Sequence, residues 1–252
     1  MSRMKRTEAP TNKKVYLLSD KLAFSAQEAY RSLRTNVTFV LPGEGCKCIG
    51  ITSPTPGDGK STTAANLAIS LGQIGKRVIL VDCDMRLPTV ATKFRVPAAP
   101  GLSDFLVGHA RIEDVIRPME KYNIHLLPAG NIPPEPTALL ESRQLERLFA
   151  AFRENYDYIL VDLPPVITVP DAVILAKLLD GYLLTVCEKQ TEHRAVKEML
   201  RRLKVAGANT LGLRAFASSK VHWQMMVVHP LDWGPAAEAH GTHTQLEAWP
   251  WA

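Results

Sequence analysis

Five short apolar runs constrain the fold of this chain more than any other feature of its sequence. They are CKCIGITS (46–53), RVILVDCD (77–84), NIHLLPAG (123–130), YDYILVDLPPV (156–166) and GYLLTVCEK (181–189). Strands that are buried on both faces have such runs, which are typical of parallel sheets. Segments with helical character lie between these runs and after the last of them, for example residues 61–75 and 191–207. The alternation predicts an α/β fold with a doubly wound, mainly parallel sheet.

The two ends of the chain differ in composition from the part between them. Residues 1–14 carry five basic side chains and one acidic side chain. We expect residues 1–20 to form a flexible, solvated basic arm, which we favour over contact with an anionic membrane, and we expect no nucleic-acid partner. Residues 213–252 contain all four tryptophans and no tyrosine. We therefore expect a single domain at residues 21–212, followed by an atypical, poorly ordered tail.

Nothing in the sequence predicts secretion or membrane insertion. No secretory signal follows the basic start, and no apolar run approaches the roughly 18 residues that a membrane-spanning helix requires. The four cysteines do not make a disulfide framework for 252 residues, and no further metal ligands lie beside Cys46 and Cys48. We therefore expect a cytoplasmic protein with reduced thiols.

The segment SPTPGDGKST (53–62) has the features of a phosphate-binding loop between a strand and a helix. Its glycines permit close approach of the backbone to a ligand, and the helix that follows favours an anion at its amino-terminal end. In this pattern Lys60, a candidate catalytic residue, reaches the outer phosphates, and Ser61 offers its hydroxyl to Mg²⁺. The strict motif has glycine where Pro54 stands, so a glycine-rich turn with an exposed lysine is the alternative. The predicted nucleotide-binding residues are Thr55, Pro56, Gly57, Asp58, Gly59, Lys60, Ser61 and Thr62.

Three aspartates stand at the ends of apolar runs. Asp82 and Asp84 are two residues apart, so both point to one face of a strand, and Asp162 ends another run. Buried like charges are costly without a cation, although each aspartate alone could simply cap a loop. We predict that Asp84 and Asp162, with Ser61, hold Mg²⁺ through oxygen and water, and that Asp82 is the base or orients the acceptor in phosphoryl transfer. Arg86 is predicted to stabilise phosphate charge, with a salt bridge as the alternative.

Three motifs in register, SPTPGDGKSTTAANLA, ILVDCDMRLP and YDYILVDLPPV, resemble those of the bacterial tyrosine kinases of capsular and exopolysaccharide synthesis. The resemblance covers about residues 15–212. It implies the P-loop fold of the MinD/ParA-type ATPases, which usually carry an additional loop lysine that has no counterpart at residues 53–56. It also implies a kinase that uses ATP and Mg²⁺ to phosphorylate protein tyrosines.

A further motif of that family, E-x-x-R-x-x-R, is matched by Glu28, Arg31 and Arg34 in EAYRSLR. The three residues lie within one broad face of the predicted helix, which alone is an ordinary surface pattern. The resemblance implies that they mediate assembly of a ring-like homo-oligomer whose subunits present tyrosines to one another. It also implies a membrane-embedded partner that anchors and activates the kinase at the inner face of the cell membrane.

The tyrosines depart from the family pattern, because Tyr182 is the last of six and the family's tyrosine-rich tail is absent. We therefore expect weak or no autophosphorylation. Two functions stay open. One is a kinase that phosphorylates tyrosines, and the other is a P-loop ATPase switch that regulates a membrane partner of polysaccharide assembly without tyrosine transfer.

Overall fold

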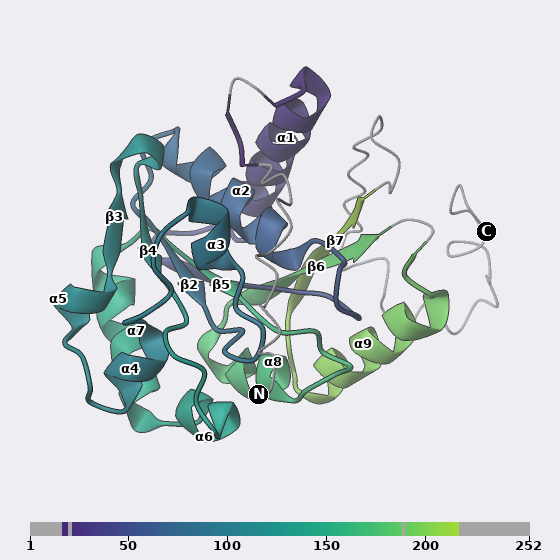
Figure 1. The fold of residues 1–252 in the computed structure, drawn as a ribbon. Helices are drawn as coiled ribbons and strands as arrows, with labels where there is room; N and C mark the ends of the chain where they lie inside the picture. Colours follow the sequence, from purple (N-terminus) through teal and green to yellow (C-terminus); the bar gives the residue numbers. More distant parts are fainter. Residues whose placement is uncertain (1–16, 20–21, 188–189, 217–252) are drawn as a thin grey trace, which may run out of the picture.

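A seven-stranded sheet forms the centre of the structure, a computed structural model that describes residues 17–19, 22–187 and 190–216. The strand order is β3-β4-β2-β5-β1-β6-β7, and all neighbours are parallel except β3 and β4 (Figure 1). The prediction of a doubly wound, mainly parallel sheet is confirmed. The strands are β1 Lys47–Thr52, β2 Val78–Asp82, β3 Arg117–Met119, β4 Ile124–Leu127, β5 Tyr158–Asp162, β6 Gly181–Cys187 and β7 Thr210–Phe216.

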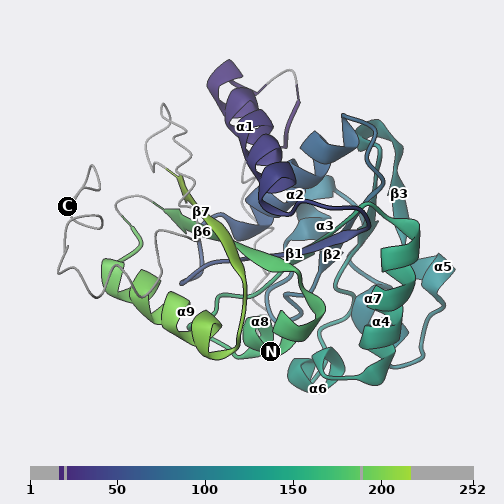
Figure 2. The same cartoon turned by 180° about the vertical axis from the view of Figure 1, so that it is seen from behind.

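Helices cover both faces of the sheet, as the two opposite views show (Figures 1 and 2). The α-helices are α1 Phe24–Val40, α2 Lys60–Gly72, α3 Val90–Phe94, α4 Leu102–Leu106, α5 Ile112–Val115, α6 Pro136–Leu140, α7 Arg143–Asn155, α8 Asp171–Ile174 and α9 His193–Val205. Two short 3₁₀ turns, η1 Glu120–Tyr122 and η2 Leu175–Leu178, complete the described elements. No helix in the described ranges is both long enough and apolar enough to cross a membrane.

The buried strands divide their side chains between two core clusters, because successive residues of a strand point to opposite faces. In β2, Ile79 and Val81 pack in one cluster, whereas Val78 and Leu80 pack in the other. The cluster that contains Val78 and Leu80 lies against α1, α2 and α3, and the other lies against α4 to α9. This double burial explains why the strands are apolar throughout.

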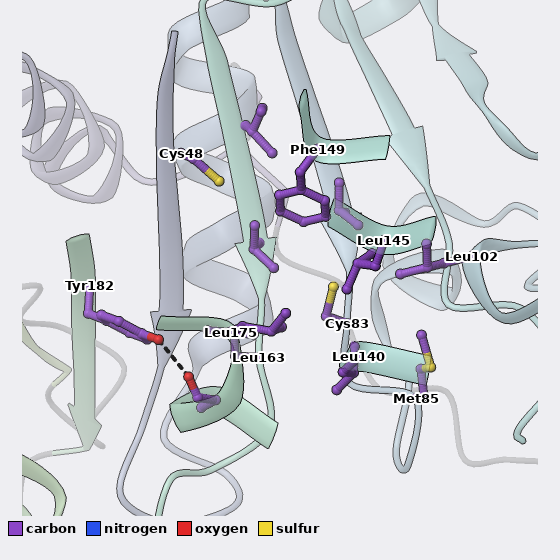
Figure 3. Close-up of a cluster of buried hydrophobic side chains, with 14 of the residues drawn as sticks. Cys48, Cys83, Met85, Leu102, Leu140, Leu145, Phe149, Leu163, Leu175 and Tyr182 are labelled. Carbon is purple, nitrogen blue, oxygen red and sulfur yellow. Dashed lines mark hydrogen bonds between the residues drawn. The ribbon is translucent and has the colours of Figure 1, made fainter. Parts of the chain in front are cut away.

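Figure 3 shows the cluster on the α7 face. Phe149 of α7 lies in this cluster together with Cys48 of β1 and Tyr182 of β6. The Tyr182 hydroxyl donates a hydrogen bond of 2.5 Å to the carbonyl oxygen of Ala172, so its polar atom is satisfied at full burial (Figure 3). The thiols of Cys48 and Cys83 are buried here and free, and burial raises the pKa of both well above the ordinary value.

The segment TALLESRQLERLFAAFREN (137–155) has the composition of one continuous helix, but it forms parts of two helices, α6 and α7. α6 ends at Leu140, and Ser142 caps α7 by accepting a hydrogen bond from the backbone N–H of Leu145 at 3.2 Å. The Ser142 hydroxyl also donates to the carbonyl oxygen of Leu139. A serine that satisfies both helix ends favours a break over a continuous helix.

The structure extends the sheet at both edges beyond the predicted strands. β3 was not predicted, because it has only three residues and contains Pro118, which is tolerated at a sheet edge. β7 continues to Phe216, past the predicted domain end at residue 212. Most of the predicted arm (1–20) and most of the predicted tail (213–252) lie outside the described residues.

Candidate active site

The sheet brings the phosphate loop and the aspartates to one edge. β5 lies between β1 and β2, and Asp162 pairs in register with Asp82 on one side and with Ile51 on the other. All three strands are parallel, so their carboxyl ends meet at the edge where ligands bind in such sheets. The loop that leaves β1 is therefore adjacent to both aspartates.

The phosphate loop has the backbone shape that the sequence predicts. Gly57 and Gly59 have φ angles of 95° and 81°, which are in the left-handed region that favours glycine. Gly59 is the N-cap of α2 and provides no side-chain cap, so the first N–H groups of the helix remain available to an anion. These residues can bind phosphate oxygens through the backbone alone.

The side chain of Asp58 stabilises the phosphate loop through hydrogen bonds. It is 1% exposed, and its Oδ2 accepts hydrogen bonds from the backbone N–H and the hydroxyl of Thr55, at 3.1 and 2.8 Å. Its Oδ1 accepts a bond of 2.6 Å from the hydroxyl of Thr191, which itself accepts one from the N–H of Cys187. Asp58 therefore holds the loop shape, a role that the sequence pattern had left as general nucleotide binding.

Thr191 is a site residue that sequence reasoning missed. It lies after β6 and is 133 residues from Asp58 along the chain. No motif surrounds it, so only the adjacency of β6 and β1 could have indicated the contact.

Lys60 lies among the aspartates, and its predicted contact with the outer phosphates stays a prediction. Its Nζ is 2.6 Å from Asp84 Oδ2 and 3.7 Å from Asp162 Oδ1, and its side chain is 11% exposed. Burial opposes the charge on Lys60, but Asp162 and Asp84 outweigh that effect and raise its pKa above the ordinary value. Lys60 therefore remains a cation within the site. The alternative of an exposed lysine on a glycine-rich turn is wrong.

Asp82 and Asp84 are both held by backbone N–H groups. Asp82 Oδ1 accepts from the N–H of Asp84 and Oδ2 from the N–H of Val90, each at 3.2 Å. Asp84 Oδ1 accepts from the N–H of Leu87 at 3.1 Å. Burial, followed by the charge of Asp162, raises the pKa of Asp82 well above its usual range. Asp82 is thus a fixed carboxylate with increased affinity for a proton.

Asp162 has the least satisfied side chain of the site. It is fully buried, and neither of its carboxylate oxygens has a hydrogen-bond partner of normal geometry among the described residues. Burial raises its pKa, although Lys60 and the nearby Ser61 hydroxyl act in the opposite direction. An unsatisfied buried carboxylate is costly unless a cation or water completes its surroundings.

The carboxylate oxygens of Asp162 and the nearby Ser61 hydroxyl suit a Mg²⁺ ion that is held through water. The described residues contain no group of three or more His, Cys, Asp and Glu side chains arranged to bind a metal directly. Mg²⁺ usually keeps several waters and takes one or two carboxylates plus substrate phosphates, so direct coordination by three side chains is not required. The oxygens of Asp162, which accept no hydrogen bond of normal geometry and lie near the Ser61 hydroxyl, meet that description.

Arg86 is bound elsewhere in the fold. Its Nε and one terminal nitrogen donate to the two oxygens of Asp171 at 2.8 and 3.1 Å, and the same terminal nitrogen donates to the Thr137 hydroxyl at 3.0 Å. Asp171 is fully buried at the start of α8. The geometry favours the salt-bridge alternative, so a role of Arg86 towards phosphate stays a prediction.

Known proteins with similar sequences decide the family. The family AAA_31, described as an AAA domain, matches residues 46–210. Tyrosine-protein kinase YwqD of Bacillus subtilis (strain 168) is 37% identical over 185 residues, which are 73% of this chain and 78% of that protein. Tyrosine-protein kinase CpsD of Streptococcus agalactiae serotype III (strain NEM316) is 33% identical over 192 residues, or 76% and 82% of the two chains. The chain belongs to the bacterial tyrosine kinase family.

Solved structures agree with this membership. The kinase domain of Escherichia coli tyrosine kinase ETK has a TM-score of 0.74 at 28% identity and covers 80% of this chain and 79% of that chain. The chimerical protein CapA2B2 has a TM-score of 0.73 at 35% identity, with 77% and 84% covered. The septum site-determining protein MinD of Pyrococcus horikoshii OT3, complexed with Mg-ADP, has a TM-score of 0.60 at 26% identity, with 72% and 74% covered. The expected MinD-like P-loop fold of a bacterial tyrosine kinase is confirmed.

The predicted assembly motif lies on α1, away from the aspartates. Arg31 pairs with Glu28 on the exposed face of the helix. Arg34 instead donates to the carbonyl oxygen of Ser70 at 2.8 Å and to its hydroxyl at 3.2 Å, which ties α1 to α2. Glu28 and Arg31 are therefore accessible on the chain surface, whereas Arg34 already has a partner within the chain. Their role in assembly stays a prediction.

Proposed function

We propose that this bacterial tyrosine kinase transfers the γ-phosphoryl group of Mg-ATP to tyrosines of proteins in capsular or exopolysaccharide assembly. The observation that carries the proposal is the contact of Lys60 with Asp84 and Asp162 at the phosphate loop, with Asp82 fixed beside them. The names of the relatives support tyrosine as the acceptor. Phosphoryl transfer depends mainly on positioning of the reactants and on stabilisation of negative charge, which these groups can provide.

Each residue has a distinct part in the proposed reaction. The N–H groups of residues 57–62 and the Lys60 ammonium bind the phosphates, while Ser61, Asp84 and Asp162 would hold Mg²⁺ through oxygen and water. Bound Mg²⁺ would offset the negative charge on the outer phosphates. As the tyrosine oxygen forms its bond to the γ-phosphorus, the bond to the β–γ bridging oxygen breaks and ADP leaves. The proton of the tyrosine hydroxyl passes to Asp82, whose raised pKa suits a general base.

The described tyrosines are poorly placed to be acceptors. Tyr30, Tyr158 and Tyr182 are buried in the core, and Tyr122 and Tyr156 are half-buried. The Tyr156 hydroxyl also forms a hydrogen bond of 2.6 Å with Nδ1 of His125. This arrangement supports transfer to another protein, with weak or no autophosphorylation of the described residues.

The proposed partners follow from the family resemblance. They are further copies of the chain, assembled through the α1 surface of Glu28 and Arg31, and a membrane-embedded protein that anchors and activates the kinase. The place of action would be the cytoplasmic face of the cell membrane. The exposed ion pair of Glu28 and Arg31 supports the first of these partners, because both side chains can exchange their contacts for those of a second copy.

A phosphotyrosine assay tests the function. The full chain is incubated with Mg-ATP and a synthetic Glu–Tyr copolymer, and phosphotyrosine is detected with an antibody. We expect signal on the copolymer, little on the chain, and none from Asp82→Ala or Lys60→Met. Asp82→Ala should still bind ATP in a calorimetric titration, whereas Lys60→Met should not.

Two results would contradict the proposal. ATP hydrolysis without phosphotyrosine on any tyrosine would favour the second candidate, a nucleotide switch that controls a membrane partner. Unchanged ATP affinity in Lys60→Met would remove the assignment of the phosphate loop.

A further inference from the structure

α3 places a second lysine at the phosphate end of α2. The N–H of Val90, the first residue of α3, donates to Asp82 Oδ2 at 3.2 Å, so this helix is tied to the aspartates. Lys93 follows within the same helix, and its Nζ donates a hydrogen bond of 3.0 Å to the hydroxyl of Thr62. Lys93 is half-buried.

Thr62 lies where phosphate is expected to bind. It is the third residue of α2, so its N–H is among the amides that have no partner within the helix. Such an end favours negative charge through both its free N–H groups and the helix dipole. The ammonium of Lys93 is therefore one hydroxyl group away from the anion-binding end of α2.

The phosphates of a bound nucleotide would add negative charge to a site that already contains three buried carboxylates. Three buried carboxylates, those of Asp82, Asp84 and Asp162, face one ammonium group, that of Lys60. Arg86, the cation that the sequence pattern indicated, is bound to Asp171 instead.

We propose that Lys93 is a second phosphate-binding residue of the nucleotide site, which contacts the inner (α or β) phosphates of bound ATP or ADP beside Thr62. The inner position follows from the order along the helix, because Lys60 at its first residue serves the outer phosphates and Thr62 lies further in. The inference rests on the proposed nucleotide binding and adds a residue to it. Lys93 thereby supplies the positive charge that Arg86 does not bring.

The test compares nucleotide affinities of the full chain by calorimetric titration in Mg²⁺ buffer. We expect Lys93→Gln to weaken Mg-ADP and Mg-ATP alike by about tenfold, which corresponds to about 1.4 kcal/mol, and to leave adenosine binding unchanged. Lys93→Arg keeps the charge and should stay within about threefold of the wild type. Lys204→Gln, an exposed lysine in the last turn of α9, is the matched control for loss of one charge and should change nothing.

Several outcomes would overturn the proposal. The first is an affinity of Lys93→Gln for Mg-ADP equal to that of the wild type. The second is a loss of Mg-ADP affinity in Lys204→Gln as large as that in Lys93→Gln. The third is an equal loss of adenosine affinity in Lys93→Gln, which would indicate a structural role. Lys93→Met, which keeps the aliphatic stem, replaces Lys93→Gln if the latter unfolds below the assay temperature. Absence of nucleotide binding in the wild type would instead refute the proposed function, so the two failures are distinguishable.

Discussion

Replacement of Arg86 by alanine should destabilise the protein more than it weakens nucleotide binding. Arg86 joins the segment after β2 to Asp171 of α8 and Thr137 of α6 through three hydrogen bonds. Asp171 is fully buried, whereas the Arg86 side chain is 37% exposed. In Arg86→Ala, the buried carboxylate keeps the Thr137 hydroxyl as a donor but loses its charged partner.

The expected magnitude follows from the burial of the pair. Breaking a fully buried ion pair costs about 3–5 kcal/mol, and exposed pairs contribute about 0–1 kcal/mol. Because solvent reaches Arg86, we expect an intermediate loss of about 2 kcal/mol in the free energy of unfolding. For a domain of this size, that loss lowers the melting temperature by about 4–8 °C.

Arg77→Ala is the matched control. Arg77 makes two side-chain hydrogen bonds to Asp157, at 3.2 and 2.8 Å, but the two side chains are 63% and 33% exposed. An exposed pair of similar geometry should contribute less than about 1 kcal/mol, or less than about 4 °C. Comparing the two variants therefore separates the effect of burying the ion pair from the effect of its hydrogen-bond geometry.

Thermal unfolding without nucleotide and calorimetric titration with Mg-ADP are the assays. We expect Arg86→Ala to keep its affinity for Mg-ADP within about threefold of the wild type. Equal melting temperatures of the two variants would refute the burial argument. An unchanged melting temperature with at least about tenfold weaker binding would show that Arg86 acts on phosphate, as the sequence pattern indicated.

Two further predictions concern the metal site and assembly. Asp162→Asn removes a buried negative charge whose oxygens accept no hydrogen bond of normal geometry among the described residues and whose ion-pair partner, Lys60, also pairs with Asp84. We therefore expect this variant to have a higher melting temperature without nucleotide and to lose the extra stabilisation that Mg²⁺ adds to ADP. Stabilisation by Mg-ADP equal to that of the wild type would contradict the metal assignment. Arg31→Glu places a like charge beside Glu28 on the α1 surface, and light scattering should then give a smaller mass than for the wild type at equal concentration; an unchanged oligomeric mass would contradict assembly through this surface.

The strands that carry the site could be predicted from the sequence alone. Buried parallel strands are apolar throughout, and Asp82 and Asp162 stand where such runs end. The glycines at positions 57 and 59 could also be interpreted from the sequence, because a phosphate-binding loop needs left-handed φ angles that favour glycine. Local rules of this kind need only neighbouring residues.

The contacts that sequence reasoning missed join residues far apart along the chain. Arg86 and Asp171 are separated by 85 positions, and Asp58 and Thr191 by 133. Neither periodicity nor a motif encodes such pairs, because strand order and helix packing bring them together. Lys93 was missed for another reason: it stands on a helix of five residues, too short to show a periodic pattern.

The register that places Asp82 beside Asp162 also determines which changes of chain length a site of this kind tolerates. One residue inserted into or deleted from a strand turns every later side chain to the opposite face. Such a change in β2 or β5 would turn an aspartate away from the loop that follows β1. An insertion between α6 and α7 would leave the pairing of the two strands intact. Related chains can therefore vary in the connections that surround the site, whereas the lengths of β2 and β5 must stay the same.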